Sequence, residues 1–162
     1  MLADSALILD LGGMSSRPGA KIVSERVELQ RVLPHLRNVL NHFPNAIISI
    51  DTIHSAVAEQ GLQEGAHIIN DISAGTYDKK MLRTVADFNA PYIAMHMKGL
   101  PHNMQKNPRY KNVTTEVMDF LARRIAACHK AGITDVIIDP GFGFGKTIEH
   151  NYTLLRNLQY FK

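Results

Sequence analysis

The most constraining feature of this sequence is an alternation of short apolar runs with longer segments of helical periodicity. Each apolar run ends in polar residues before a turn or loop, and the runs are residues 6–10, 46–51, 67–71, 91–96 and 136–139. Runs of this length predict β-strands. They are apolar on both faces for most of their length, which is typical of parallel strands covered on both sides.

Five helical patterns lie between and after these strands, at residues 24–43, 55–64, 78–89, 114–131 and about 149–160. In the first, apolar residues recur every three or four positions, which predicts one buried face, and Pro34 predicts a kink or a restart. Gly65 and Gly132 are predicted to close the second and fourth helices. Strands that alternate with helices indicate a parallel sheet, either doubly wound or closed as a (β/α)₈ barrel.

Both folds place their chemistry at the carboxyl ends of the strands. Polar residues stand there in this chain, namely Asp10, Asp51, Asn70, Asp71, His96 and Asp139. A single Asp in such a place is often only the cap of the next helix. Because polar residues recur at all five strand ends, a ligand site is favoured. Asp51, Asn70 and Asp139 would offer two carboxylates and one amide, a set that suits a flat heterocycle with several N–H groups.

Composition and charge exclude several other classes of protein. The 162 residues are 45% hydrophobic and 20% charged, as in an ordinary globular domain. The single cysteine, Cys128, forms no intramolecular disulfide and favours a reducing, cytoplasmic setting. No apolar run is long enough for a membrane helix, and no export signal is visible. The net charge of +3 is mild and scattered, which argues against nucleic acid and is compatible with an anionic small molecule.

Residues 139–146 form a glycine-rich segment between a predicted strand and a predicted helix. Pro140 occupies the position of the first glycine of a P-loop, so the segment is not that phosphate-binding motif. Two interpretations of its alternating Gly and Phe stay open. Either Phe142 and Phe144 offer flat faces to an aromatic ligand, or they cap the core at a turn.

Other local features point to a small-molecule site more than to metal or covalent chemistry. Arg17, in the loop of residues 12–20, suits a carboxylate or a pyrophosphate if it is not simply solvated. Strand alternation predicts that Met95 and His96 face opposite sides. The histidines lack zinc-ligand spacing, and no Ser or Cys nucleophile motif is present.

Taken in order, these segments resemble the dihydropteroate synthase family of folate biosynthesis. The matching segments are residues 15–20, 49–52, 69–71, 95–105 and 139–146, so the resemblance covers nearly the whole chain. It implies a (β/α)₈ TIM barrel that joins 6-hydroxymethyl-7,8-dihydropterin diphosphate to 4-aminobenzoate with Mg²⁺ assistance and releases pyrophosphate. It implies small-molecule substrates in the cytoplasm, no nucleic acid or membrane partner, and a possible homodimer of the full-length protein.

The resemblance also implies a role for individual residues. The pterin-binding residues would be Asp51, Asn70, Met95 and Asp139. The aminobenzoate-binding residues, where sulfonamides compete, would be Ser16, Arg17, Pro18 and Phe144. Asp51 and Asp139 would be the catalytic carboxylates, and Asp51 would stabilise positive charge that develops as the diphosphate leaves.

The chain departs from the family pattern in two places and at both ends. The family usually has Glu at Met14 and Thr at Ser16. It also has an earlier strand whose Asn binds the metal, and later strands with basic pterin and diphosphate ligands. Because such a barrel usually takes about 250 residues, residues 1–162 are expected to form a partial pterin-binding TIM-barrel domain of five βα units, without a metal ligand and inactive alone.

Two alternative functions remain. One is a pterin-binding methyltransferase domain, which would share the pterin acids but should lack the Ser-Arg-Pro-Gly-Ala and Met-His-Met segments present here. The other is a partial chain with a structural or regulatory role, whose cut strands would expose unpaired backbone groups.

Overall fold

The computed structural model describes residues 1–2 and 5–162. Within this range, strands and helices alternate in the predicted order. The elements are β1 (Ile8–Gly12), α1 (Glu25–His42), β2 (Ile47–Asp51), α2 (Ser55–Gln63), β3 (Ile68–Asp71), α3 (Met81–Asp87), β4 (Tyr92–Met95), α4 (Val113–Ala131), β5 (Val136–Asp139), α5 (Ile148–Arg156) and the 3₁₀ helix η2 (Leu158–Phe161).

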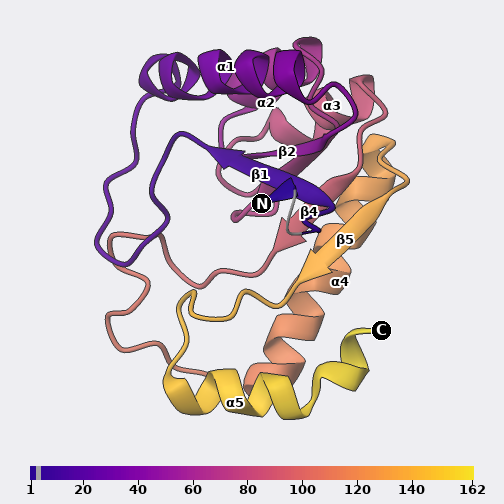
Figure 1. Cartoon of the computed structure of the whole chain (residues 1–162). Coiled ribbons are helices and arrows are strands. Elements are labelled where there is room, and N and C mark those ends of the chain that lie inside the picture. Colours follow the sequence, from indigo (N-terminus) through magenta and orange to yellow (C-terminus); the bar gives the residue numbers. More distant parts are fainter. Residues whose placement is uncertain (3–4) are drawn as a thin grey trace.

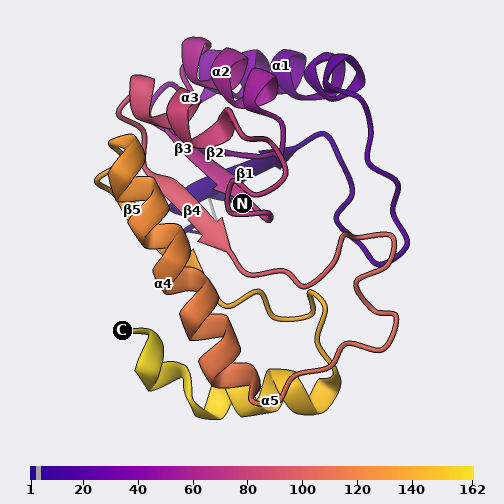
Figure 2. The ribbon, with the colours of Figure 1, turned by 180° about the vertical axis from the view of Figure 1, so that it is seen from behind.

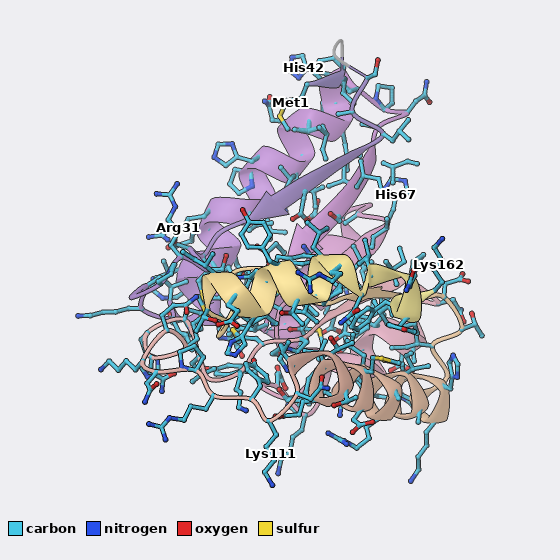
Figure 3. The ribbon with its side chains drawn as sticks, turned by 90° about the horizontal axis from the view of Figure 1, so that it is seen from below. Met1, Arg31, His42, His67, Lys111 and Lys162 are labelled. Atoms are coloured by element: carbon cyan, nitrogen blue, oxygen red, sulfur yellow. The ribbon has the colours of Figure 1, made fainter. Side chains whose placement is uncertain are left out.

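The strands form one sheet in the order β1-β2-β3-β4-β5, and every neighbouring pair is parallel. A doubly wound sheet reverses its strand order at an internal switch point, and the described strands have no such point. The consecutive order is that of a (β/α)₈ barrel. Helices α1 to α4 lie along one face of the sheet, and α5 packs beside α4 at the lower end of the molecule (Figures 1 and 2). Seen from below in Figure 3, the yellow helix α5 lies nearest the viewer.

The two faces of the sheet differ in burial. On the helix side, Ile48, Ile50 and Ile69 are fully buried in the main core. On the opposite, inner face, Ile8 and Ile137 are 42% and 50% exposed. The expected cover on both sides is therefore present only on the helix face among the described residues, and the inner face is open to solvent along part of its length.

Helix α1 continues through Pro34 as a single helix, so the predicted restart is wrong. Pro34 is exposed, whereas Glu28, Val32 and Leu36 recur every four residues along the buried stripe of the helix. Packing on this stripe holds both halves of the helix against the sheet, which outweighs the one backbone hydrogen bond that proline cannot donate.

The ends of α4 follow the predicted signals. The side chain of Asn112 accepts hydrogen bonds from the backbone N–H groups of Thr114 and Thr115, and Gly132 ends the helix with a φ of +102°. The last helical pattern is shorter than expected, because α5 ends at Arg156 and the 3₁₀ helix η2 follows. No helix in the described part of the chain has the length and apolar character needed to cross a membrane.

Candidate functional site

The carboxyl ends of the strands bring the predicted pterin residues onto one face of the sheet. Asp51 is level with Asn70 on the neighbouring strand, and Met95 is level with Asp139. Register partners in parallel strands point to the same side, and alternate residues along a strand share a face. Asn70 is level with Ile93, two residues before Met95. All four side chains therefore start from the inner face, with Asp51 and Asn70 adjacent and Asp139 two strands away from Asn70.

Asp10 is not a strand-end residue, contrary to the prediction, because β1 runs on to Gly12. Its register partner is Ser49, two residues before Asp51. The Asp10 carboxylate accepts hydrogen bonds from the Ser49 hydroxyl and, at 3.0 Å, from the Asn70 amide nitrogen. Asp10 therefore orients the Asn70 side chain from one layer below the strand ends.

The Asp51 carboxyl has no hydrogen-bond partner among the described residues, although it lies close to other carboxylates. Burial, followed by the negative charges of Asp10, Glu28 and Asp71, raises its pKa to about 7. A partly buried acid that lacks a donor is an acceptor available to a ligand with N–H groups. Gly12 leaves room for it, because a Cβ there would lie 3.3 Å from the Asp51 Cβ.

Asp71 takes a structural role, because it points to the helix side of the sheet. It is fully buried, and its carboxylate accepts from the Ser73 backbone N–H and hydroxyl at 2.7 Å each, the Gly75 N–H at 2.8 Å and the Tyr92 hydroxyl at 2.7 Å. Burial raises its pKa, and these hydrogen bonds oppose the rise. Asp71 therefore fixes the turn that follows β3.

Met95 and Phe144 meet in a small apolar cluster at the strand ends. Its buried members are Ile53, Ile72 and Met95, and the side chains packed against them are Met14, Ile22, Met97 and Phe144. Phe142 is 41% exposed. Of the two interpretations of the glycine-rich segment, the structure therefore shows Phe144 capping a local core, and the same placement puts its ring near the inner mouth of the sheet.

His96 points away from this cluster, as the strand alternation predicts. Its ring makes an edge contact with Phe120 of α4, with 5.0 Å between ring centroids. It is buried, and burial together with the nearby Lys146 lowers its pKa to about 3. The His96 ring is therefore neutral at physiological pH and belongs to the helix layer.

The loop between β1 and α1 lies across the strand ends. Met14 and Ile22 from this loop pack on the Met95 cluster. Near its tip, the Gly19 N–H donates to the Pro101 carbonyl at 2.9 Å, so the loop meets the one that follows β4 (Figure 1).

Ser16, Arg17 and Pro18 occupy this loop near Gly19. Arg17 and Pro18 are exposed. The Arg17 guanidinium has neither a hydrogen bond nor an ion pair in the described part of the chain. The structure therefore places these residues in the loop that crosses the carboxyl ends of the strands, but Arg17 makes no ion pair with the carboxylates there.

A buried pair beneath this loop was missed by sequence reasoning. Glu28 of α1 is fully buried, its Oε2 lies 2.7 Å from His54 Nδ1, and its Oε1 has no partner. The Arg31 guanidinium donates to the Gly13 carbonyl at 2.9 Å, which holds the start of the loop. One signal was available, because Glu28 precedes Val32 and Leu36 at four-residue spacing.

The glycine-rich segment is held against the chain that follows β4. A Cβ at Gly141 would lie 2.0 Å from the His96 carbonyl oxygen, and one at Gly145 would lie 2.4 Å from the Lys98 carbonyl oxygen. Both glycines have positive φ, at +69° and +63°. These two glycines therefore allow a close approach between the backbone of the segment and the backbone that follows β4.

The described residues do not fit a metal centre of their own. No group of three or more His, Cys, Asp or Glu side chains in this part of the chain is placed to hold a metal ion. Asp10, the carboxylate nearest in register to Asp51, is already engaged with Ser49 and Asn70.

Comparisons with known proteins identify the family. The family model described as "Pterin binding enzyme" matches residues 1–162. The chain is similar to the dihydropteroate synthases of Haemophilus influenzae and Escherichia coli, at 44% and 42% identity over 99% of its length. Among solved structures it is similar to Yersinia pestis dihydropteroate synthase in a sulfonamide complex, with a TM-score of 0.94 at 40% identity over 99% of this chain. The Xanthomonas albilineans synthase with 4-aminobenzoic acid matches 98% of the chain with a TM-score of 0.91 at 38% identity.

The chain spans 57–58% of the length of the two curated relatives, and 58% and 56% of the two solved chains. Its five parallel βα units, in consecutive strand order, match 58% of the Yersinia pestis enzyme chain, which confirms the expected five consecutive units of a (β/α)₈ barrel. Because the family model matches residues 1–162, and the strand order and strand-end residues agree with it, the chain belongs to the family of pterin binding enzymes.

Proposed function

We propose that this chain carries the pterin-binding half of a dihydropteroate synthase, which condenses 6-hydroxymethyl-7,8-dihydropterin diphosphate with 4-aminobenzoate. The observation that carries the proposal is the Asp51 carboxyl, which is unpaired beside Asn70 on the inner face of the strand ends. The relatives named above support the reaction, and they do not favour the methyltransferase alternative or a purely structural role.

In this proposal the pterin lies flat across the ends of β2 to β5. Asp51 accepts hydrogen bonds from pterin N–H groups, and Asn70, oriented by Asp10, both donates and accepts. Met95 supplies the apolar surface beneath the ring. Asp139 Oδ1 already accepts from the Gly141 N–H at 2.7 Å, which leaves its other oxygen for the ligand.

The proposed chemistry is a substitution at the exocyclic carbon of the pterin. The carbon–oxygen bond to diphosphate breaks, and the electron pair leaves with pyrophosphate. The amine of 4-aminobenzoate then donates its lone pair to the carbon and releases a proton. Asp51, in its carboxylate form, stabilises the positive charge that develops on the pterin methylene between these steps, and Asp139 holds the ring in place.

The aminobenzoate would enter from the side of the β1–α1 loop. Phe144 packs beside Met95 and offers a ring face to the incoming aromatic. The exposed Arg17 guanidinium is free to pair with the aminobenzoate carboxylate, and Ser16 and Pro18 flank it in the loop. Sulfonamides would compete at this subsite.

Mg²⁺ is proposed as a companion of the diphosphate substrate. Mg²⁺ would reach the site with the diphosphate and neutralise part of its negative charge. We also propose a cytoplasmic setting, which the single buried thiol of Cys128 supports, and small-molecule substrates rather than nucleic acid or membrane as partners. A homodimer of the full-length protein is part of the same proposal and rests on the family resemblance.

Titration of this chain with 6-hydroxymethylpterin tests the proposal. We expect saturable binding that Asp51→Asn weakens by roughly 10- to 100-fold, because a hydrogen bond to a charged group contributes about 1.5–3 kcal/mol. The matched control is Asp135→Asn, an exposed site just before β5, which should leave affinity unchanged. Absence of saturable binding, or equal affinity in Asp51→Asn, would contradict the assignment.

A further inference from the structure

We propose that Lys146 is a positioning residue for the aminobenzoate side of the pocket. Its side chain ties residues 141–145 of the glycine-rich segment to the chain leaving β4, and so sets the ring of Phe144 against Met95. The inference rests on the proposed function, because it assigns Phe144 to the aminobenzoate subsite. Lys146 would act through the position of Phe144 and would not contact a ligand itself.

The contacts of Lys146 join three backbone carbonyls and one ring. The residue is 3% exposed, and its Nζ lies 2.8 Å from the Gly141 oxygen, 3.0 Å from the Phe144 oxygen, 3.3 Å from the His96 oxygen and 2.9 Å from His96 Nδ1. Two of the four partner atoms, the Gly141 and Phe144 oxygens, belong to the glycine-rich segment, and the other two belong to His96, the residue that follows β4. A single ammonium group therefore spans the two neighbouring strand ends.

Enough acceptors surround the Lys146 ammonium to pair all of its N–H donors. An ammonium has three N–H donors, and four acceptor atoms surround it, since the neutral His96 ring accepts through Nδ1. Burial lowers the pKa of Lys146 to about 7, and the Asp139 carboxylate opposes that shift. A buried lysine is unfavourable unless its donors are paired, so its place here is explained by the carbonyls that it holds.

Other polar contacts hold the rim of the segment, and within the segment the Phe144 N–H donates to the Gly141 carbonyl at 3.1 Å, a carbonyl that Lys146 also holds. Gln105 donates to the Gly143 carbonyl, Tyr110 donates to the Gly145 carbonyl at 2.8 Å, and Asn151 accepts from the Gly143 N–H at 2.9 Å. The Phe144 carbonyl is held by Lys146. Removing the ammonium should therefore release the backbone at Phe144 while the strands that carry Asp51 and Asn70 stay in place.

The test compares Lys146→Met, which keeps the unbranched length and removes the donors, with Lys130→Met as matched control. Lys130 is an exposed lysine in the last turn of α4. Three quantities are measured in this chain: the Kd for 6-hydroxymethylpterin, the Kd for 4-aminobenzoate with pterin and pyrophosphate present, and amide hydrogen exchange at Gly143 and Phe144.

For Lys146→Met we expect at least a tenfold higher aminobenzoate Kd, a pterin Kd within threefold of wild type, and at least tenfold faster exchange at Phe144. Lys130→Met should change none of these. If Lys146→Met does not fold, Lys146→Gln, which retains one amide donor group, should show the same selective loss in a smaller degree.

Two results would overturn the inference while leaving the proposed function intact: an unchanged aminobenzoate Kd, or parallel losses for both ligands, which indicate a purely structural role. Failure of the wild-type chain to bind pterin would overturn the proposed function and this inference with it.

Discussion

Asp71→Ala is expected to lower the free energy of unfolding by about 3–5 kcal/mol. The substitution removes the acceptor of four hydrogen bonds, which come from the Ser73 N–H and hydroxyl, the Gly75 N–H and the Tyr92 hydroxyl. These donors are then left without their acceptor in or near the core. Each buried donor left unpaired costs about 1–3 kcal/mol. Urea unfolding followed by circular dichroism measures the loss.

Two further variants separate this effect from the loss of charge. Asp71→Asn keeps one acceptor oxygen and the side-chain shape, and Tyr92→Phe removes a single hydrogen bond, so both should lose less than Asp71→Ala, with Tyr92→Phe near 1 kcal/mol. An Asp71→Ala loss below about 1 kcal/mol would show that Asp71 does not hold the β3–α3 turn.

Asp51→Asn is expected to stabilise the ligand-free chain in a pH-dependent way. The folded-state pKa of Asp51, about 7, lies above the unfolded value near 3.9, so folding at high pH confines a charge that the folded state disfavours. This cost is absent below about pH 4, grows as pH rises from 4 to 7, and is fully present above pH 7. Asn carries no such cost, and the gain at pH 8 should be about 1–3 kcal/mol.

Urea unfolding at pH 4, 6 and 8 provides the measurement, with Asp135→Asn as the matched control. The control should differ little from wild type at every pH, because its side chain is exposed. A pH-independent difference between Asp51→Asn and wild type would contradict the crowded-carboxylate environment. The same variant weakens pterin binding in the proposal, so stability and binding should move in opposite directions.

The number, type and order of the elements were predictable because a buried parallel strand has a distinctive apolar run and each helix has a period near 3.6. The ends of β1 were not. Residues 6–11 are largely apolar and are followed by glycines at positions 12 and 13, so the pattern alone does not decide whether the strand ends at Asp10 or Gly12. Because β1 is two residues longer than predicted, Asp10 lies one layer below the carboxyl ends of the strands and not at them.

The candidate site was predictable only as a set of strand-end residues. Alternation requires that Asn70 and Asp71 face opposite sides, but two adjacent polar residues do not show which one faces inward. The buried charges Glu28 and Lys146 were harder, because a charged residue is usually exposed. Their partners, His54 and His96, lie 26 and 50 residues away in the sequence, so only the fold reveals that they are paired.

The most direct test of the central claim is the pKa of Asp51 with and without pterin, measured by ¹³C NMR of its carboxyl carbon, with Asp51→Asn identifying the signal. We expect a pKa near 7 in the free chain and, with saturating 6-hydroxymethylpterin, a decrease of at least one unit, because ligand N–H groups stabilise the carboxylate. A pKa that stays unchanged or rises when pterin is bound would contradict the claim that Asp51 accepts hydrogen bonds from the pterin.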